Sequence, residues 1–176
     1  MSALTRTPQN TNLLQPTKFL LTFSRIPAAQ YFLQSVNLPG ITAGQTMINT
    51  PIHDYYVAPV KMEFSNLNIN FLLDESLQSW KDIYYWFRSV ASPESIEERN
   101  RLRRLQTGKD DKSSYYSDGI LTLLSNLNNP IMRIEFFNLF PISLSDVQFD
   151  TRQSADDVMT ADATFVFEYF NFLPVS

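Results

Sequence analysis

A change in hydrophobic period near residue 74 organises the chain. Between residues 67 and 73 apolar side chains alternate with asparagines, which predicts a strand with one buried face. After Asp74, which suits the start of a helix, apolar side chains recur at three- and four-residue steps until Pro93. The positions of this predicted helical stripe are Leu77, Trp80, Ile83, Tyr84, Phe87 and Val90. We therefore expect Trp80 and Phe87 to be buried against the apolar strand face, whose residues are Leu67, Ile69 and Phe71.

Shorter alternating runs predict further strands. Runs at 18–23 and 31–36 indicate a first pair of strands, and later runs indicate strands at 119–124, 131–137, 147–150 and 161–170. Turns of hairpin length join most sequence neighbours, which favours antiparallel pairing. The predicted fold class is therefore mainly β, with about seven strands and one dominant flanking helix.

The N-terminal residues have a different composition from the rest of the chain. Residues 1–17 are polar and contain Pro8 and Pro16, so they predict an extended arm. The remaining residues, 18–176, are expected to form a single β domain.

Residues 41–61 do not read as a central strand. Gly44, Pro51 and Pro59 interrupt the segment, which favours an edge strand or an exposed extension. Unpaired strand edges readily pair with another chain, so we expect this segment to contact a neighbouring subunit. The apolar candidates for that contact are Met47, Ile48, Ile52, Tyr55 and Tyr56.

Residues 94–118 form the most polar part of the chain. The four-residue spacing of Glu97 and Arg101 favours a short helix with its apolar side chains inward, followed by a polar loop. Those apolar side chains are Ile96, Leu102 and Leu105. The basic run at 99–104 adjoins acidic residues and contains no aromatic side chain, which favours a solvated or partner-facing surface over a nucleic-acid platform. The candidates on this surface are Arg99, Arg101, Arg103 and Arg104.

Composition narrows the class of protein. The chain of 176 residues is 44% hydrophobic and 14% aromatic, which is typical of a folded domain. A net charge of −4 disfavours a general nucleic-acid binder, and the absence of cysteine excludes disulfides and thiolate chemistry. Because the sequence contains no apolar run long enough to span a membrane and no signal-peptide core at its start, we expect assembly in a cytosol.

No pattern of residues predicts catalysis, a metal site or a cofactor. The only histidine, His53, is next to Asp54, without the further ligands that a zinc site needs. The four glycines form no phosphate-binding loop, and no nucleophile elbow is present. Asp150, Asp156 and Asp157 lack the spacing of a calcium loop. These observations favour a structural protein over an enzyme.

The order of several short motifs resembles the tail tube proteins of T4-like contractile-tailed bacteriophages, over about residues 18 to 172. The motifs are Lys18-Phe19, FLQSVNLPGI at 32–41, Thr50-Pro51, LNINFLLDE at 67–75, the tryptophan-containing helix, FPISLS at 140–145, Phe149-Asp150 and TADATF at 160–165. The resemblance implies a β-sandwich or half-barrel with a flanking helix. It also implies hexameric rings that stack into a tube inside a contractile sheath.

The same resemblance implies partners and a location. The partners would be further copies of this chain, the tail sheath protein, baseplate tube-initiator proteins, and DNA that passes through the lumen without specific binding. The location would be the virion, after assembly in the host cytoplasm. A tube-initiator or tube-terminator ring, a type VI secretion-like tube, and a small soluble or effector-binding module remain open as alternatives.

A wall that lets DNA slide should not be basic, because each cation adds a phosphate contact. The candidate lumen-facing acids are those that we expect on strands and not in the polar loop, namely Asp54, Glu63, Asp162 and Glu168. Asp162 should point away from the face of Ala161 and Ala163, while Glu63 should share a face with Lys61. The alternative is that these acids form ordinary ion pairs at subunit joints.

Overall fold

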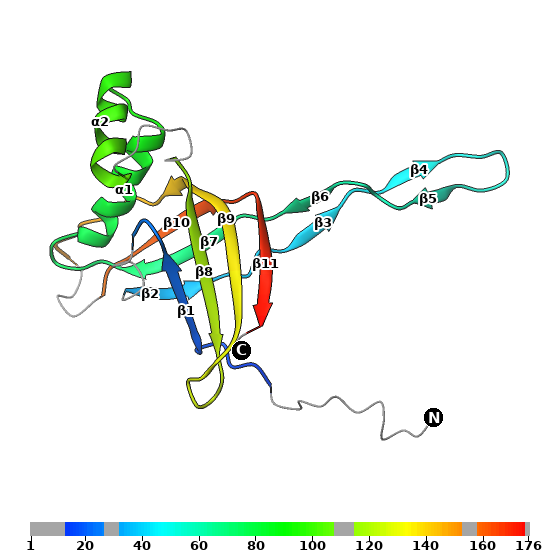
Figure 1. Ribbon diagram of the computed structural model, residues 1–176, viewed down its shortest axis with the longest axis horizontal. Helices are drawn as coiled ribbons and strands as arrows, with labels where there is room; N and C mark the ends of the chain where they lie inside the picture. The colour runs from blue at the N-terminus through cyan, green and yellow to red at the C-terminus, as the bar shows by residue number, and fades with distance from the viewer. Residues whose placement is uncertain (1–12, 27–31, 108–114, 153–157, 175–176) are drawn as a thin grey trace.

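A computed structural model describes residues 13–26, 32–107, 115–152 and 158–174. Within these ranges the chain forms eleven strands and two helices (Figure 1). The strands are β1 (Phe19–Phe23), β2 (Leu33–Val36), β3 (Ile41–Ala43), β4 (Thr46–Ile48), β5 (Tyr55–Val57), β6 (Met62–Phe64), β7 (Leu67–Leu72), β8 (Ser117–Leu124), β9 (Pro130–Leu144), β10 (Thr160–Val166) and β11 (Tyr169–Pro174). The helices are α1 (Gln78–Val90) and α2 (Ile96–Thr107).

Seven strands form one sheet in the order β1-β8-β9-β10-β7-β2, and β11 also pairs with β9. All the pairings are antiparallel, which confirms the predicted fold class. The long strand β9 changes partners along its length: residues 132–137 pair with β11, whereas residues 140–144 pair with β10. Asn138 lies between the two parts with a φ of 53°, and it bends the sheet into two layers.

The core lies between these layers and consists of the inward side chains of every long strand. Leu67, Ile69 and Phe71 of β7 are buried, as the alternation predicts. They contact inward residues of the other strands, including Leu21, Phe23, Leu121, Ile134, Phe136, Ala161, Ala163 and Phe165. Asp162 is exposed between its two buried alanine neighbours, which confirms its predicted orientation.

Asp74 lies three residues before Leu77, the N-cap residue of α1, and its carboxylate binds the first amides of the helix. The helix begins at Gln78, later than the sequence indicates. The Asp74 carboxylate accepts hydrogen bonds from the backbone amides of Gln78 and Ser79, at 3.1 and 3.2 Å. The hydroxyl of Ser76 also donates to this carboxylate. The Ser76 hydrogen bond, with smaller contributions from the two amides, lowers the pKa of Asp74 to about 2.

Replacing Asp74 by alanine should lower the free energy of unfolding by about 1 kcal/mol at neutral pH. Because the folded-state pKa of Asp74 lies below its ordinary value of 3.8, its contribution is present above that value and disappears as the pH falls towards 2. Urea denaturation at neutral pH and in acid measures the difference between the wild type and Asp74→Ala. The exposed neighbour Glu75 is the control, and Glu75→Ala should leave stability nearly unchanged. A difference that is undiminished in acid would contradict this account.

The buried face of α1 differs from the predicted stripe by about a quarter turn, at 100° per residue. Its buried residues are Ser79, Ile83, Trp86 and Ser89. Trp80 is only partly buried, with its Nε1 donating to the carbonyl of Ser145 at 3.3 Å, and Phe87 is likewise only partly buried. The prediction that these two rings are buried is therefore wrong in part, because both are only partly buried while Trp80 still packs against the core. The buried face includes two serines, Ser79 and Ser89, which a hydrophobicity pattern does not detect.

Several strand predictions also need correction. β1 and β2 do not pair with each other, because β1 pairs with β8 and β2 pairs with β7, at opposite ends of the sheet. Residues 147–150 form no strand. The predicted strand at 161–170 is two strands, β10 and β11, which pair with different parts of β9. Local alternation carries no information on which distant segment becomes the partner.

The polar segment after residue 94 contains a second full helix, α2, which packs against α1. The predicted inward face of this helix is wrong at Ile96, which is 64% exposed, while Leu102 is half-buried. The Leu105 side chain lies outside the described residues, as do residues 1–12 of the predicted arm. Residues 13–17 of that arm are exposed.

Candidate functional site

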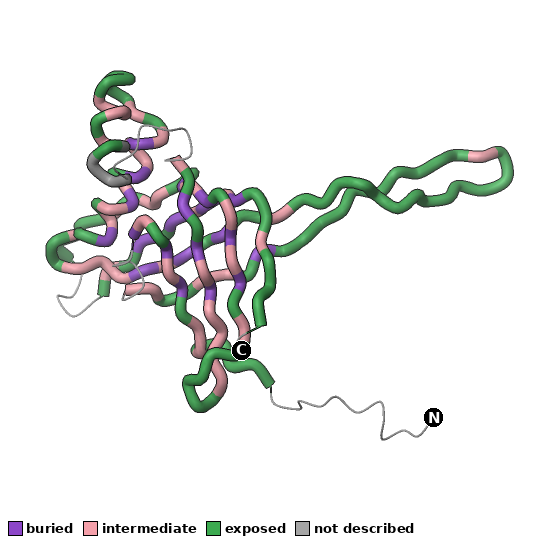
Figure 2. Tube along the Cα trace, in the orientation of Figure 1, coloured by how far each residue is buried: buried purple, intermediate pink, exposed green. Residues whose placement is uncertain are grey.

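A two-stranded hairpin projects from the sheet and forms the most distinctive surface of the molecule (Figure 1). Its root is the pair β3 and β6, with Ile41 opposite Phe64, and its distal part is the pair β4 and β5, with Met47 opposite Tyr56. Every residue from 41 to 63 is exposed except the half-buried Thr50 (Figure 2). No other element of the described chain covers either face of this hairpin.

The residues that interrupt the segment also shape the hairpin. Gly44 separates β3 from β4, and Pro59 lies between β5 and β6. At the tip, the Thr50 hydroxyl donates to the His53 carbonyl and accepts from the His53 amide. Lys61 and Glu63 form an ion pair of 2.8 Å at the root, which confirms that they share a face. The predicted exposed extension is therefore a hairpin with defined turns.

The predicted contact residues all lie on the distal part of the hairpin. Their exposed fractions are 49% for Met47, 39% for Ile48, 93% for Ile52, 46% for Tyr55 and 64% for Tyr56. Further exposed apolar side chains that the sequence analysis did not single out are Ile41, Val57, Val60 and Met62. A lone two-stranded ribbon is only marginally stable in water, and a long apolar surface of this kind is typical of a binding site.

The four candidate lumen acids do not gather on one surface. Asp54 lies in the turn region of the hairpin and Glu63 lies at its root. Asp162 lies on β10 of the sheet, while Glu168 lies between β10 and β11 and accepts a hydrogen bond from the Asn138 side chain. Asp54 and Glu168 are therefore not strand residues, contrary to the prediction. The hydrogen bond and charge of Lys61 lower the pKa of Glu63.

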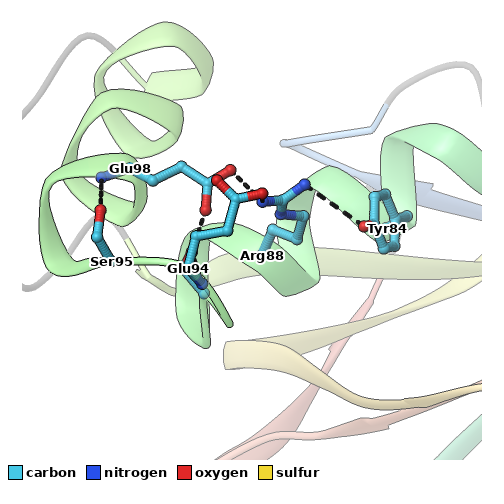
Figure 3. A network of polar contacts seen from close by, with 6 residues as sticks. Tyr84, Arg88, Glu94, Ser95 and Glu98 are labelled. Atoms are coloured by element: carbon cyan, nitrogen blue, oxygen red, sulfur yellow. Dashed lines mark hydrogen bonds and ion pairs between the residues drawn. The ribbon is translucent and has the colours of Figure 1, made fainter.

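A polar network joins the two helices (Figure 3). The Arg88 guanidinium donates to the carboxylates of Glu98 and Glu94, and more weakly to the Tyr84 hydroxyl at 3.5 Å. The Ser92 hydroxyl donates to Glu98, whose pKa is lowered first by this hydrogen bond and then by Arg88. The side chains of Arg88 and Glu98 are 18% and 10% exposed, so this pair is shielded from water. The network holds α2 against α1.

Neutralising Glu98 should loosen α2 without unfolding the sheet. In Glu98→Gln the shielded Arg88 loses its shielded charged partner and keeps only the exposed carboxylate of Glu94. We therefore expect faster hydrogen exchange of the α2 amides and unchanged exchange in the strands β7, β8, β9 and β10. The matched control is Glu94→Gln, because the Glu94 side chain is 69% exposed and a solvated ion pair contributes little. Equal exchange of the α2 amides in the two variants would contradict the role of Glu98.

The outer surface of α2 carries two of the four predicted basic residues. Arg101 and Arg104 are exposed and line a hollow together with Glu97 and Asn100. Arg99 lies over the ring of Tyr115, with 5.8 Å between the guanidinium carbon and the ring centroid. The Arg103 side chain lies outside the described residues. The helix therefore presents a mixed, mainly basic surface.

The described residues contain no cluster of three or more His, Cys, Asp or Glu side chains that would suit a metal ion. His53 is at the exposed tip of the hairpin, with its ring centroid 6.4 Å from that of Tyr55. Among the described residues, neither helix has the length and apolar character needed to cross a membrane.

Comparisons with known proteins identify a family and a shared fold. The family model described as phage tail tube protein matches residues 17–173. The tail tube terminator protein of Enterobacteria phage T4 is 27% identical over 148 residues, which cover 78% of this chain and 74% of that protein. Two solved structures share the fold. The tube terminating cap of the anti-feeding prophage has a TM-score of 0.68 at 11% identity, with 99% of this chain and 100% of that chain covered. The second is a chain of the PVC sheath-tube complex, which is an extracellular contractile injection system in its extended state. Its TM-score is 0.60 at 13% identity, with 94% of this chain and 94% of that chain covered.

Proposed function

The chain belongs to the phage tail tube protein family, and from this premise we propose that it is a ring-forming structural subunit of a contractile phage tail. The rings, expected to be hexameric, would surround the channel through which DNA passes into the host. This function needs extensive contacts between identical subunits and needs no catalytic group.

The observation that carries the proposal is the projecting hairpin with its exposed apolar side chains. A surface on one subunit that fits a different surface on the next makes a head-to-tail contact, and such contacts close into rings or continue as stacks. A free monomer would expose this apolar hairpin to water, whereas a ring or a stack of rings buries it. The hairpin is therefore the proposed inter-subunit contact, through Met47, Ile48, Ile52, Tyr55 and Tyr56.

Two positions in the tail suit such a subunit. One is the repeated subunit of the tube, and the other is the terminator ring at the end of the tube. A specific observation favours the second position, because the T4 protein with 27% identity is named a tail tube terminator. In either position the proposed subunit would form a ring around the channel.

The basic surface of α2 is the proposed contact with the sheath or with the baseplate. Arg101 and Arg104 are exposed on a helix that stands apart from the hairpin (Figure 1). Charged residues at the rim of an interface mainly set the rate and specificity of association. Replacement of both by serine should therefore weaken binding to the sheath while rings still form.

Electron microscopy of the purified protein, combined with copy counting in purified virions by quantitative mass spectrometry, tests the proposal. Long tubes and many copies per virion would identify the repeated subunit. A single ring per virion, bound at one end of the tube, would identify the terminator. A single ring bound at the baseplate end would instead identify an initiator. A protein that stays monomeric at high concentration and is absent from virions would overturn the proposal and favour a soluble module.

A further inference from the structure

The outward side of one sheet layer is rich in short polar side chains. It is formed by β2, β7, β10 and the end of β9, and we call it the polar face. Its residues are Ser35, Asn37, Asn66, Asn68, Asn70, Ser143, Ser145, Asp162 and Thr164. The register places them in rows across the strands, with Asn70 between Ser35 and Asp162, and Thr164 between Asn68 and Ser143. Leu72 marks one border of the face, and Val166 with its partner Phe140 marks the other. The exposed Ile142 precedes Ser143 where the register shifts.

The polar groups of this face form hydrogen bonds with one another. The Asn70 amide donates to the Asp162 carboxylate at 2.8 Å, and the Thr164 hydroxyl donates to the Asn68 side chain at 3.0 Å. The Asn37 side chain donates to the backbone carbonyl of Asn66 at 3.0 Å, and its oxygen accepts from the backbone amide of Asn68. Five side chains of this face therefore have hydrogen-bond partners within the face itself.

The charge of this face is also unusual for a protein surface. Its residues include one carboxylate, that of Asp162, and no lysine or arginine. The outward side of the other layer is different: Arg133 lies between Thr122 and Leu173 in the register, and Glu135 lies between Ile120 and Asn171. That side offers charged and apolar anchors, which the polar face lacks.

We propose that the polar face lines the channel of the assembled rings and is the surface past which DNA moves. This inference rests on the proposed function. A basic side chain in the wall would bind a phosphate in every subunit of every ring, and large aromatic side chains would stack on bases. Short side chains that are already hydrogen-bonded to one another do neither, and they leave the channel wide.

This wall works through the lack of contacts, not through acidic repulsion. Of the four acids predicted to face the lumen, only Asp162 lies on the polar face, and its charge accepts a hydrogen bond from Asn70. Asp54 and Glu63 lie on the hairpin, and Glu168 lies beyond the border of the face at the β10–β11 corner.

The test is a lysine placed on the polar face and a matched lysine placed elsewhere. Asn68 and Asn171 are both exposed asparagines on strands, but Asn171 lies on β11, away from the polar face. Virions that carry Asn68→Lys should assemble normally and deliver DNA about tenfold more slowly. Virions that carry Asn171→Lys or Asp162→Asn should deliver DNA at the wild-type rate. Purified Asn68→Lys rings should also retain DNA on a filter at low salt, and less so as salt rises.

Separate outcomes distinguish this inference from the proposed function. Wild-type protein that never enters virions would overturn the proposed function itself. Normal DNA delivery by assembled Asn68→Lys virions would show that the polar face is not the channel wall. Slowed delivery by Asp162→Asn virions would show that acidic repulsion is needed, and would overturn a wall that works through the lack of contacts. If Asn68→Lys fails to assemble, Ser35→Lys on the edge strand β2 repeats the test on the same face with the same expectations.

Discussion

Removal of the distal hairpin should give a folded protein that no longer assembles. The variant joins Ala43 to Met62, which lie opposite each other in the β3–β6 register, through an Asn-Gly turn. The deleted residues are exposed and pair only within the hairpin, so the core keeps its contacts and thermal unfolding should change by only a few degrees. Rings and tubes should be absent from electron micrographs, because the proposed inter-subunit contact is gone.

Single substitutions at the tip refine this experiment. Ile52 is 93% exposed, so Ile52→Asp costs the folded monomer little but would place a charge in a buried contact. We expect Ile52→Asp to assemble far less than the wild type, and Ile52→Leu to assemble normally as the matched control. Light scattering across a concentration series measures both. Normal rings from the deletion variant would show that the hairpin is not the contact.

Replacement of Trp86 by alanine should cost about 3–5 kcal/mol of unfolding free energy, the largest effect expected for a single substitution in this chain. The Trp86 side chain is fully buried and joins α1 to both sheet layers. Its ring centroid lies 6.5 Å from that of Phe23 on β1 and 5.6 Å from that of Phe165 on β10. Its Nε1 donates to the Tyr115 carbonyl at 3.1 Å, so the truncation also removes a buried hydrogen bond.

Trp80 provides the matched control on the same helix. Its side chain is only partly buried and stacks on Tyr84, with 5.3 Å between ring centroids. Trp80→Ala should therefore cost clearly less than Trp86→Ala. Urea denaturation of both variants measures the difference in unfolding free energy. A larger loss of unfolding free energy in Trp80→Ala than in Trp86→Ala would support the buried face predicted from the hydrophobic stripe. It would contradict the packing of Trp86 in the core.

The sequence by itself determined the features that depend on near neighbours. The alternation at 67–73 identified β7 and its buried face, because successive side chains of a strand point to opposite sides. The role of Asp74 at the start of α1 was identified because its carboxylate binds amides only four and five residues away, although the N-cap position itself is Leu77. The glycine and prolines at 44–59 predicted an exposed extension, and that segment is the projecting hairpin. The ordered motifs at 18–172 pointed to the family whose model matches 17–173.

Tertiary structure alone decided the features that join distant segments. The pairing of β1 with β8 and of β2 with β7 depends on which edges meet, and local periodicity is the same for any partner. The choice of Trp86 over Trp80 for the core depends on which face α1 turns inward, and that face includes two buried serines. The polar face combines residues from four strands, and the hydrogen bond between Asn70 and Asp162 forms only because β7 pairs with β10. Hydrogen-bond partners 92 positions apart are selected by the whole fold, since no local pattern encodes their contact.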